Sequence, residues 1–191
     1  MGLLVLGLVL FLGVHLVPTA PTLRRSLVSR MGERGYRGAF SGVAAAGLVL
    51  TVVGFARAPN EPVLFAPMPW AIAAAPSVVG AAFVLLAAAR MRGHLRRIVR
   101  HPMLVGTLLW AAVHLAANGD ARSTVLFGAF LAWALVDLAS AAARGAVAAF
   151  EPKLAHDAVA ILAGGAAAVA FAWAHGVLIG VKVVPFGLGA G

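Results

Sequence analysis

The sequence predicts an all-α membrane protein, a six-transmembrane-helix bundle with both termini on the outer (periplasmic) side. Of its 191 residues, 62% are hydrophobic and only 11% are charged, well outside the balance of a soluble globular domain. The apolar residues fall into six runs that are each long enough to cross a bilayer. Roughly a dozen of the fifteen Lys and Arg residues lie in three alternating connections, which the positive-inside rule places in the cytoplasm.

The first expected span covers residues 2–23. It lacks a basic stretch ahead of it and is too long for a signal peptide. The following residues, 24–37, are strongly basic, and Gly32 and Gly35 punctuate them as turn residues. We therefore expect a cytoplasmic loop after the first span.

The second and third expected spans cover residues 40–56 and 70–89. Between them lies a proline-rich, nearly neutral segment, residues 58–69, which we expect to face outward. The third span leads into the densest positive cluster of the chain, made of Arg90, Arg92, His94, Arg96, Arg97 and Arg100. This cluster is the strongest expected anchor on the inner side.

The last three expected spans cover residues 98–117, 123–143 and 158–181. The sequence Asn118-Gly119-Asp120 predicts a tight turn between the first two, and a connection of mixed charge precedes the last. Small residues should let helices approach closely at four places: Gly106, Gly164, Gly165 and Gly176. No internal repeat is evident, so residues 1–191 are expected to form a single domain.

The net charge and the cysteine content exclude several functions. A formal net charge of +9 would suit a nucleic-acid partner in a soluble chain, but here the basic residues serve topology, and the expected partner is the lipid bilayer. No Cys is present, which removes disulfides, thiolate ligands, cysteine nucleophiles and iron–sulfur clusters. Six His residues remain as candidate metal ligands.

The fourth span carries the most informative pattern. Its polar or polarizable residues share one face of a helix with 3.6 residues per turn: Met103, Thr107, Trp110, His114 and Asn118. An imidazole within hydrocarbon needs a hydrogen-bond partner, a wet cavity or a metal. His114 is therefore either a polar contact between helices or the axial ligand of a metal cofactor.

The chain resembles the NnrU family of bacterial membrane proteins, which is similar to the 15-cis-zeta-carotene isomerases. The resemblance covers nearly the whole chain and rests on His15, Gly32-Glu33-Arg34-Gly35-Tyr36-Arg37, Arg100-His101-Pro102, and Trp110 to His114 with Asn118-Gly119-Asp120. Arg100-His101-Pro102 also opens a helix in isoprenylcysteine-type methyltransferases, which leaves a membrane methyltransferase as a lesser alternative. The resemblance implies a multi-pass protein of the bacterial inner (plasma) membrane.

The resemblance also implies haem b, with His15 and His114 as the iron ligands. His175 is the alternative ligand, because its depth in the sixth span is close to that of His114. In the isomerases a Cys lies one helical turn before the second histidine, whereas this chain has Ala111 there. A thiolate-for-imidazole ligand exchange is therefore excluded.

Four further residues are expected around the cofactor. Arg100 is a candidate partner of a haem propionate, because guanidinium groups pair bidentately with carboxylates. His101 is either a second propionate partner or simply the residue that starts its helix. Trp110 and Asn118 are expected to line the site.

Other ionisable groups are interpreted more simply. Asp137 in the fifth span is costly unless it is paired. It either accepts a hydrogen bond from a ligand imidazole or forms a salt bridge with Arg144, two turns onward. His94 and His156 fall in expected loops, where we predict solvated side chains without a role.

The resemblance to NnrU proteins implies a redox or accessory role in nitrite and nitric oxide reduction (denitrification), beside a nitrogen-oxide reductase or redox partner. The alternative is a haem-dependent cis–trans isomerase of a hydrophobic polyene such as zeta-carotene. The sequence contains no paired carboxylates, activated serine or phosphate-binding loop, so catalysis would depend on the iron. No catalytic residue is assigned.

Overall fold

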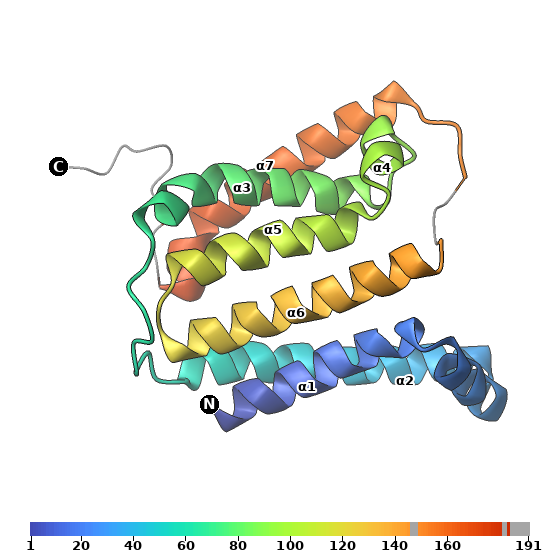
Figure 1. Ribbon diagram of the computed structural model, residues 1–191, viewed down its shortest axis with the longest axis horizontal. Helices are drawn as coiled ribbons and strands as arrows, with labels where there is room; N and C mark the ends of the chain where they lie inside the picture. Colours follow the sequence, from blue (N-terminus) through green and yellow to red (C-terminus); the bar gives the residue numbers. More distant parts are fainter. Residues whose placement is uncertain (146–148, 181–182, 184–191) are drawn as a thin grey trace.

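The computed structural model describes residues 1–145, 149–180 and 183. Within these residues the chain is all-α and has no β-strand, as predicted. Its elements are α1 (Gly2–Leu16), the 3₁₀ turn η1 (Val17–Thr19), α2 (Pro21–Arg57), α3 (Pro69–Ala88), α4 (His94–Val99), α5 (Pro102–Ala117), α6 (Ala121–Ala143) and α7 (Leu154–Ile179). The long helices pack one against the next in the order α2, α1, α6, α5, α3, α7. Helix α6 therefore lies between the α1–α2 pair and the group of α3, α5 and α7 (Figure 1).

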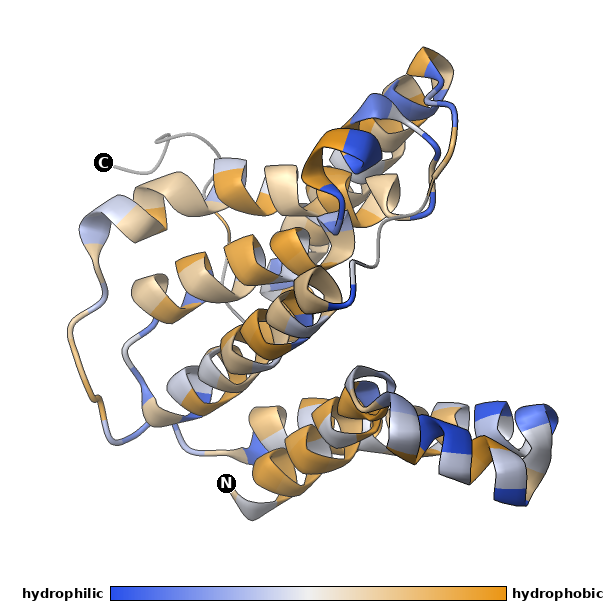
Figure 2. Ribbon diagram, turned by 45° about the vertical axis from the view of Figure 1, so that its right-hand side comes forward, coloured by the Kyte–Doolittle hydropathy of each residue, from blue (hydrophilic) through white to orange (hydrophobic). Residues whose placement is uncertain are grey.

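Five of the described helices are long and apolar enough to cross a membrane: α1 continued by η1, α2, α3, α6 and α7. Helix α5 is also apolar but has only 16 residues, about 24 Å, whereas a bilayer core is about 30 Å thick. Large apolar side chains cover the outside of the bundle, and Trp173 on α7 is 86% exposed. Figure 2 shows hydrophobic residues along the middle of the helices and hydrophilic residues gathered near their ends. The chain is a multi-pass membrane protein.

The helices run alternately in opposite directions along the bundle. In Figure 1 the start of α1 and the end of α7 lie at the same end of the bundle, on the left. Helix α4 and the arginine-rich first half of α2 lie at the other end, which we call the basic end. The connection between α2 and α3 and the turn between α5 and α6 lie at the end of the termini.

The first helix is shorter than expected. The prediction gave one kinked span over residues 2–23, but α1 ends at Leu16 and a separate helix begins at Pro21. Proline lacks an N–H, so it is favoured at the first position of a helix and disfavoured further inside. The prolines therefore divide this stretch into two helices rather than bending one.

The basic loop expected over residues 24–37 is helical instead. Helix α2 runs through it with one break at Gly32, whose φ of 71° suits glycine. Leucine, arginine, methionine and glutamate supply much of this stretch, and all four are good helix formers. Glu33 also pairs with Arg24 at 3.3 Å and with Arg37 at 3.2 Å. The prediction of a loop here was wrong, because it weighed charge and glycine above helix propensity.

The expected span over residues 98–117 also begins later than predicted. The chain is non-helical at Arg100, whose φ is 62°, and at His101. Pro102 then starts α5, since a residue before proline is disfavoured in the helical region. Residues 94–99 form the separate short helix α4.

Close helix contacts depend on glycines, as expected for a membrane bundle. A Cβ on Gly106 would lie 2.9 Å from the carbonyl oxygen of Ala82, and one on Gly164 would lie 2.5 Å from the Cα of Val84. These two predictions are confirmed, whereas Gly165 faces open space. The α1–α2 contact relies on three glycines that the sequence did not single out, namely Gly7, Gly47 and Gly54.

The tight turn predicted at residues 118–120 is present between α5 and α6. Asp120 caps α6 by accepting a hydrogen bond from the backbone N–H of Ser123 at 3.0 Å. The connection between α2 and α3 lies across this turn, where the N–H of Leu64 donates to the carbonyl of Gly119 at 2.7 Å. The α2–α3 connection therefore helps to hold the end of α5 in place.

Candidate functional site

His114 lies in the last turn of α5 and is half-buried among aromatic rings. Its Nδ1 is 2.8 Å from the carbonyl oxygen of Trp110. Because a carbonyl only accepts, Nδ1 carries the proton and the lone pair of the ring is on Nε2. The rings of Trp110 and Phe127 lie 5.4 Å and 4.7 Å from the imidazole. His114 therefore has the tautomer and the fixed orientation that a metal ligand requires.

His175 on α7 is the histidine that the fold brings to His114. The two imidazoles are close enough to interact electrostatically, although they are far apart in sequence. Helices α5 and α7 both pack against α3 but do not pack closely against one another. The ring of Phe171 lies 6.1 Å from that of His175. This pair was the alternative ligand set in the sequence analysis.

His15 lies in the last turn of α1, towards the basic end. Its Nδ1 is 2.6 Å from the carbonyl oxygen of Phe11, so its lone pair is also on Nε2. The imidazole is surrounded by Phe11 at 4.4 Å, Phe40 at 5.0 Å and Trp133 at 6.0 Å between ring centroids. The tautomer of His15 suits a ligand as well as that of His114 does.

His15 and His114 are not in contact, because α6 lies between α1 and α5 (Figure 1). His15 contacts Trp133 of α6, whereas His114 contacts Phe127, and these positions lie about 9 Å apart along the helix. A chain of rings spans the distance instead, from Phe11 to Phe130 at 5.9 Å and from Phe130 to Trp110 at 5.3 Å. The fold thus joins the two predicted ligands only through aromatic side chains.

Arg100 and His101 lie at the opposite end of α5 from His114. Arg100 is exposed and His101 is half-buried at the start of the helix. The residues between His101 and His114 correspond to about 20 Å of helix. The structure therefore does not bring Arg100 or His101 to the imidazole of His114.

Trp110 and Asn118 do lie beside His114. The amide of Asn118 donates to the carbonyl of His114 at 2.8 Å, which satisfies one of the free carbonyls at the end of α5. Trp110 supplies both the carbonyl that holds the imidazole and a ring that packs edge-on against Phe127 and Phe130. Both residues therefore help to position His114.

The residues present fit a haem better than a bare metal ion. No group of three or more His, Asp or Glu side chains that could hold a metal occurs within the described part of the chain. A haem needs only one or two protein ligands for its iron. His114 and His175 would supply two imidazoles, and the surrounding aromatic side chains suit a planar, apolar cofactor.

Asp137 forms a salt bridge with Arg144, which was one of the two predictions for this residue. Its Oδ1 lies 4.0 Å from Nη2 of Arg144. Arg144 also reaches the hydroxyl of Ser140 and the carbonyl of Thr19, so it ties the end of α6 to η1.

The prediction that His94 and His156 are solvated and without a role holds only in part, because the side chain of His94 is 51% exposed but both histidines make contacts. Asp157 is buried in the first turn of α7, and its Oδ2 lies 2.8 Å from Nδ1 of His94. His156 accepts a hydrogen bond from the backbone N–H of Arg92 at 2.9 Å. These contacts join the α3–α4 connection to the start of α7. The sequence signal that could have indicated this junction is Asp157, an acidic residue directly before the last apolar run.

Comparison with protein-family models matches residues 3–183 to the family described as NnrU protein. The match covers nearly the whole chain, so the chain belongs to the NnrU family. No curated protein and no solved structure matches it. The predicted family is thus confirmed, and the similarity to the carotene isomerases stays a prediction.

Proposed function

We propose that this NnrU-family protein binds one haem b between α5 and α7, with His114 and His175 as axial ligands. The main support is the half-buried imidazole of His114, which Trp110 holds with Nε2 unprotonated. The imidazole of His175 lies within electrostatic range of it. Helices α5 and α7 do not pack closely together. A planar group inserted between them would therefore break no close contact of α5 with α7.

His15 is the second candidate for the other axial position, as the family resemblance implies. Its ring has the correct tautomer, but Phe130 and Trp133 of α6 lie between it and His114. Axial nitrogens on one iron must lie about 4 Å apart, since each metal–imidazole bond is about 2 Å long. Pairing His15 with His114 would require a large movement of α6, which is why we favour His175.

The proposed role is redox or accessory, beside membrane enzymes that reduce nitrite or nitric oxide. A haem with two imidazole ligands supplies one-electron chemistry without an open coordination position. The protein's own contribution is to hold the imidazoles and to exclude water with Trp110, Phe127 and Phe130. The absence of cysteine rules out thiolate ligation, and this donor set favours electron transfer or gated gas sensing over catalysis.

The proposed topology has six membrane passes in the bacterial inner membrane, with both termini outside. Helix α5 is the short pass, and it packs between α3 and α6, so part of its length contacts protein rather than lipid. The arginine-rich segments at the basic end support an inner location for that end. Six passes also agree with the position of the start of α1 and the end of α7 at one end of the bundle.

Purification in mild detergent tests the haem proposal. The protein should show a Soret band, and the pyridine haemochrome spectrum should identify haem b. His114→Ala should lose most of the haem, whereas His156→Gln, which removes an imidazole at the basic end, should keep it. A colourless protein that also fails to take up added haemin would contradict the proposal.

A further inference from the structure

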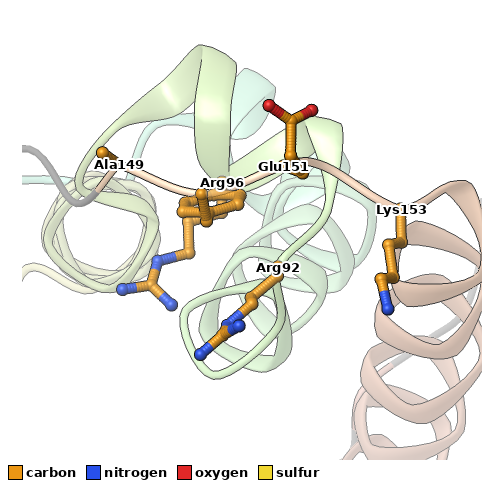
Figure 3. Close-up of a pocket in the computed structure, with 6 residues that line it drawn as sticks. Arg92, Arg96, Ala149, Glu151 and Lys153 are labelled. Atoms are coloured by element: carbon orange, nitrogen blue, oxygen red, sulfur yellow. The ribbon is translucent and has the colours of Figure 1, made fainter.

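An open pocket lies at the basic end, between the α3–α4 connection and the segment before α7. Its volume is about 440 Å³, and it is lined by Arg92, Arg96, Ala149, Phe150, Glu151 and Lys153. We call it the basic pocket. The residues come from the α3–α4 connection, from α4 and from the segment before α7, which is far from them in sequence, and Figure 3 shows the labelled side chains where these segments meet.

The charge in the basic pocket is unbalanced. Three cationic side chains line it against one carboxylate, that of Glu151. In Figure 3 the guanidinium groups of Arg92 and Arg96 point to one side and the carboxylate of Glu151 points to the other. None of the ion pairs found among the described residues joins Glu151 to these cations. The cations are therefore available to an anion from outside the chain.

Hydrogen bonds hold together the two segments that line the pocket. The N–H of Lys153 donates to the carbonyl of Arg92 at 2.8 Å, and the N–H of Arg92 donates to Nδ1 of His156 at 2.9 Å. The guanidinium of Arg96 lies over the ring of Phe150 at 5.3 Å, a cation–π contact that fixes its direction. The backbone of Arg92 and Lys153 and the guanidinium of Arg96 are thus positioned before any anion binds, which lowers the entropic cost of binding.

We propose that the basic pocket binds the phosphate of an anionic phospholipid headgroup. Phosphate matches the forked donors of arginine and the point charge of lysine. Two large apolar side chains of the elements that carry the pocket are strongly exposed, Ile98 of α4 at 77% and Leu154, the residue after Lys153, at 75%, and they offer contact to acyl chains that free phosphate lacks. Basic pockets between helices on the cytoplasmic side of membrane proteins bind anionic headgroups in this way.

Native mass spectrometry of the delipidated full-length protein in mild detergent tests this inference. Phosphatidylglycerol should bind at least tenfold more tightly than phosphatidylcholine with the same acyl chains. Arg96→Gln and Lys153→Gln should each weaken phosphatidylglycerol binding about fivefold, since each removes one cation near the surface. Arg97→Gln is the matched control, because Arg97 is an exposed cation of α4 that does not line the pocket.

Three results would overturn the inference. Equal affinity for the two lipids would show that no anionic headgroup is selected. An equal loss in Arg97→Gln would show that only the total charge matters. Displacement of phosphatidylglycerol by an equal concentration of inorganic phosphate would show that free phosphate, not lipid, occupies the pocket. Unfolding temperatures of all variants separate loss of binding from loss of folding, and Lys153→Gln changes an exposed side chain.

Discussion

The carboxylate of Asp157 accepts a hydrogen bond from the backbone N–H of His94 at 2.8 Å, although the two residues belong to different helices. The other carboxylate oxygen accepts from the N–H of Leu95 at 2.9 Å. These N–H groups belong to the first turn of α4, where a helix has no partners of its own for them. Asp157 of α7 therefore caps the start of α4 and joins these two helices at the basic end.

Removal of the Asp157 carboxylate should destabilise this junction. Asp157→Ala leaves the N–H groups of His94 and Leu95 without acceptors in a partly buried position. We expect a clearly lower unfolding temperature in detergent. The control is Glu151→Gln, an exposed acid without an ion pair among the described residues. Equal unfolding temperatures of the two variants would contradict the capping role.

A side chain at Gly93 should destabilise the fold while Asp157 is in place. A Cβ there would overlap the carboxylate of Asp157, whose Cγ would be 2.7 Å away. The backbone of Gly93, with φ −100° and ψ 174°, is open to any residue, so the main obstacle to Gly93→Ala is this overlap, beside a tight contact of 3.2 Å with the backbone N of Asp157. We expect a loss of about 1–3 kcal/mol in the free energy of unfolding, as for other overpacked sites.

A double variant checks the cause of that loss. In the Asp157→Ala background, Gly93→Ala should cost much less than it does alone, because the overlapping group is gone. Thermal unfolding of the four proteins measures this coupling. Additive losses would mean that the two positions act independently.

The sequence was sufficient to predict the helical class, the family and the membrane character, because long apolar runs separated by arginine clusters admit few other structures. It also predicted the turn at residues 118–120 and the close approaches at Gly106 and Gly164. These features depend on the composition of a short stretch of sequence, which can be interpreted without knowing which helix packs against it.

What the sequence did not predict depends on distant contacts. The contact of Asp157 with His94 joins residues far apart in the chain, and nothing in either neighbourhood marks the other. The choice between His15 and His175 as the neighbour of His114 likewise depends on which helix packs where. The sequence offered the family resemblance, which favoured His15, and depth in the membrane, which favoured His175, and neither shows that α6 lies between α1 and α5.

The two adjacent glycines of α7 should respond in opposite ways to the same substitution. Gly164→Ala places a Cβ against the backbone of Val84 and Phe83, so α3 and α7 must separate, at a cost of about 1–3 kcal/mol. Gly165→Ala meets open space and should be neutral or stabilising by about 0.5–1 kcal/mol, because alanine favours helix. Unfolding in detergent measures both. A similar destabilisation by both substitutions would rule out the proposed packing.

The topology can be measured on single-cysteine variants, since the chain contains no Cys. Asn60→Cys lies in the exposed connection between α2 and α3 and should react with a membrane-impermeant maleimide in intact spheroplasts. Arg97→Cys and Glu151→Cys lie on exposed positions at the basic end and should react only after permeabilisation. Labelling of Arg97→Cys in intact spheroplasts would contradict the inner location of the basic end.

The identity of the second iron ligand is the sharpest test of the proposed haem site. If His175 pairs with His114, His175→Ala should lose haem or open a coordination position that carbon monoxide fills rapidly in the ferrous protein. His15→Ala should keep both the haem content and the slow gas binding of the parent protein, because Phe130 and Trp133 separate His15 from His114. Absorption spectra and carbon monoxide mixing kinetics measure the two properties. If His15→Ala loses as much haem as His114→Ala while His175→Ala keeps it, the pairing implied by the family resemblance is correct and α6 must move when haem binds.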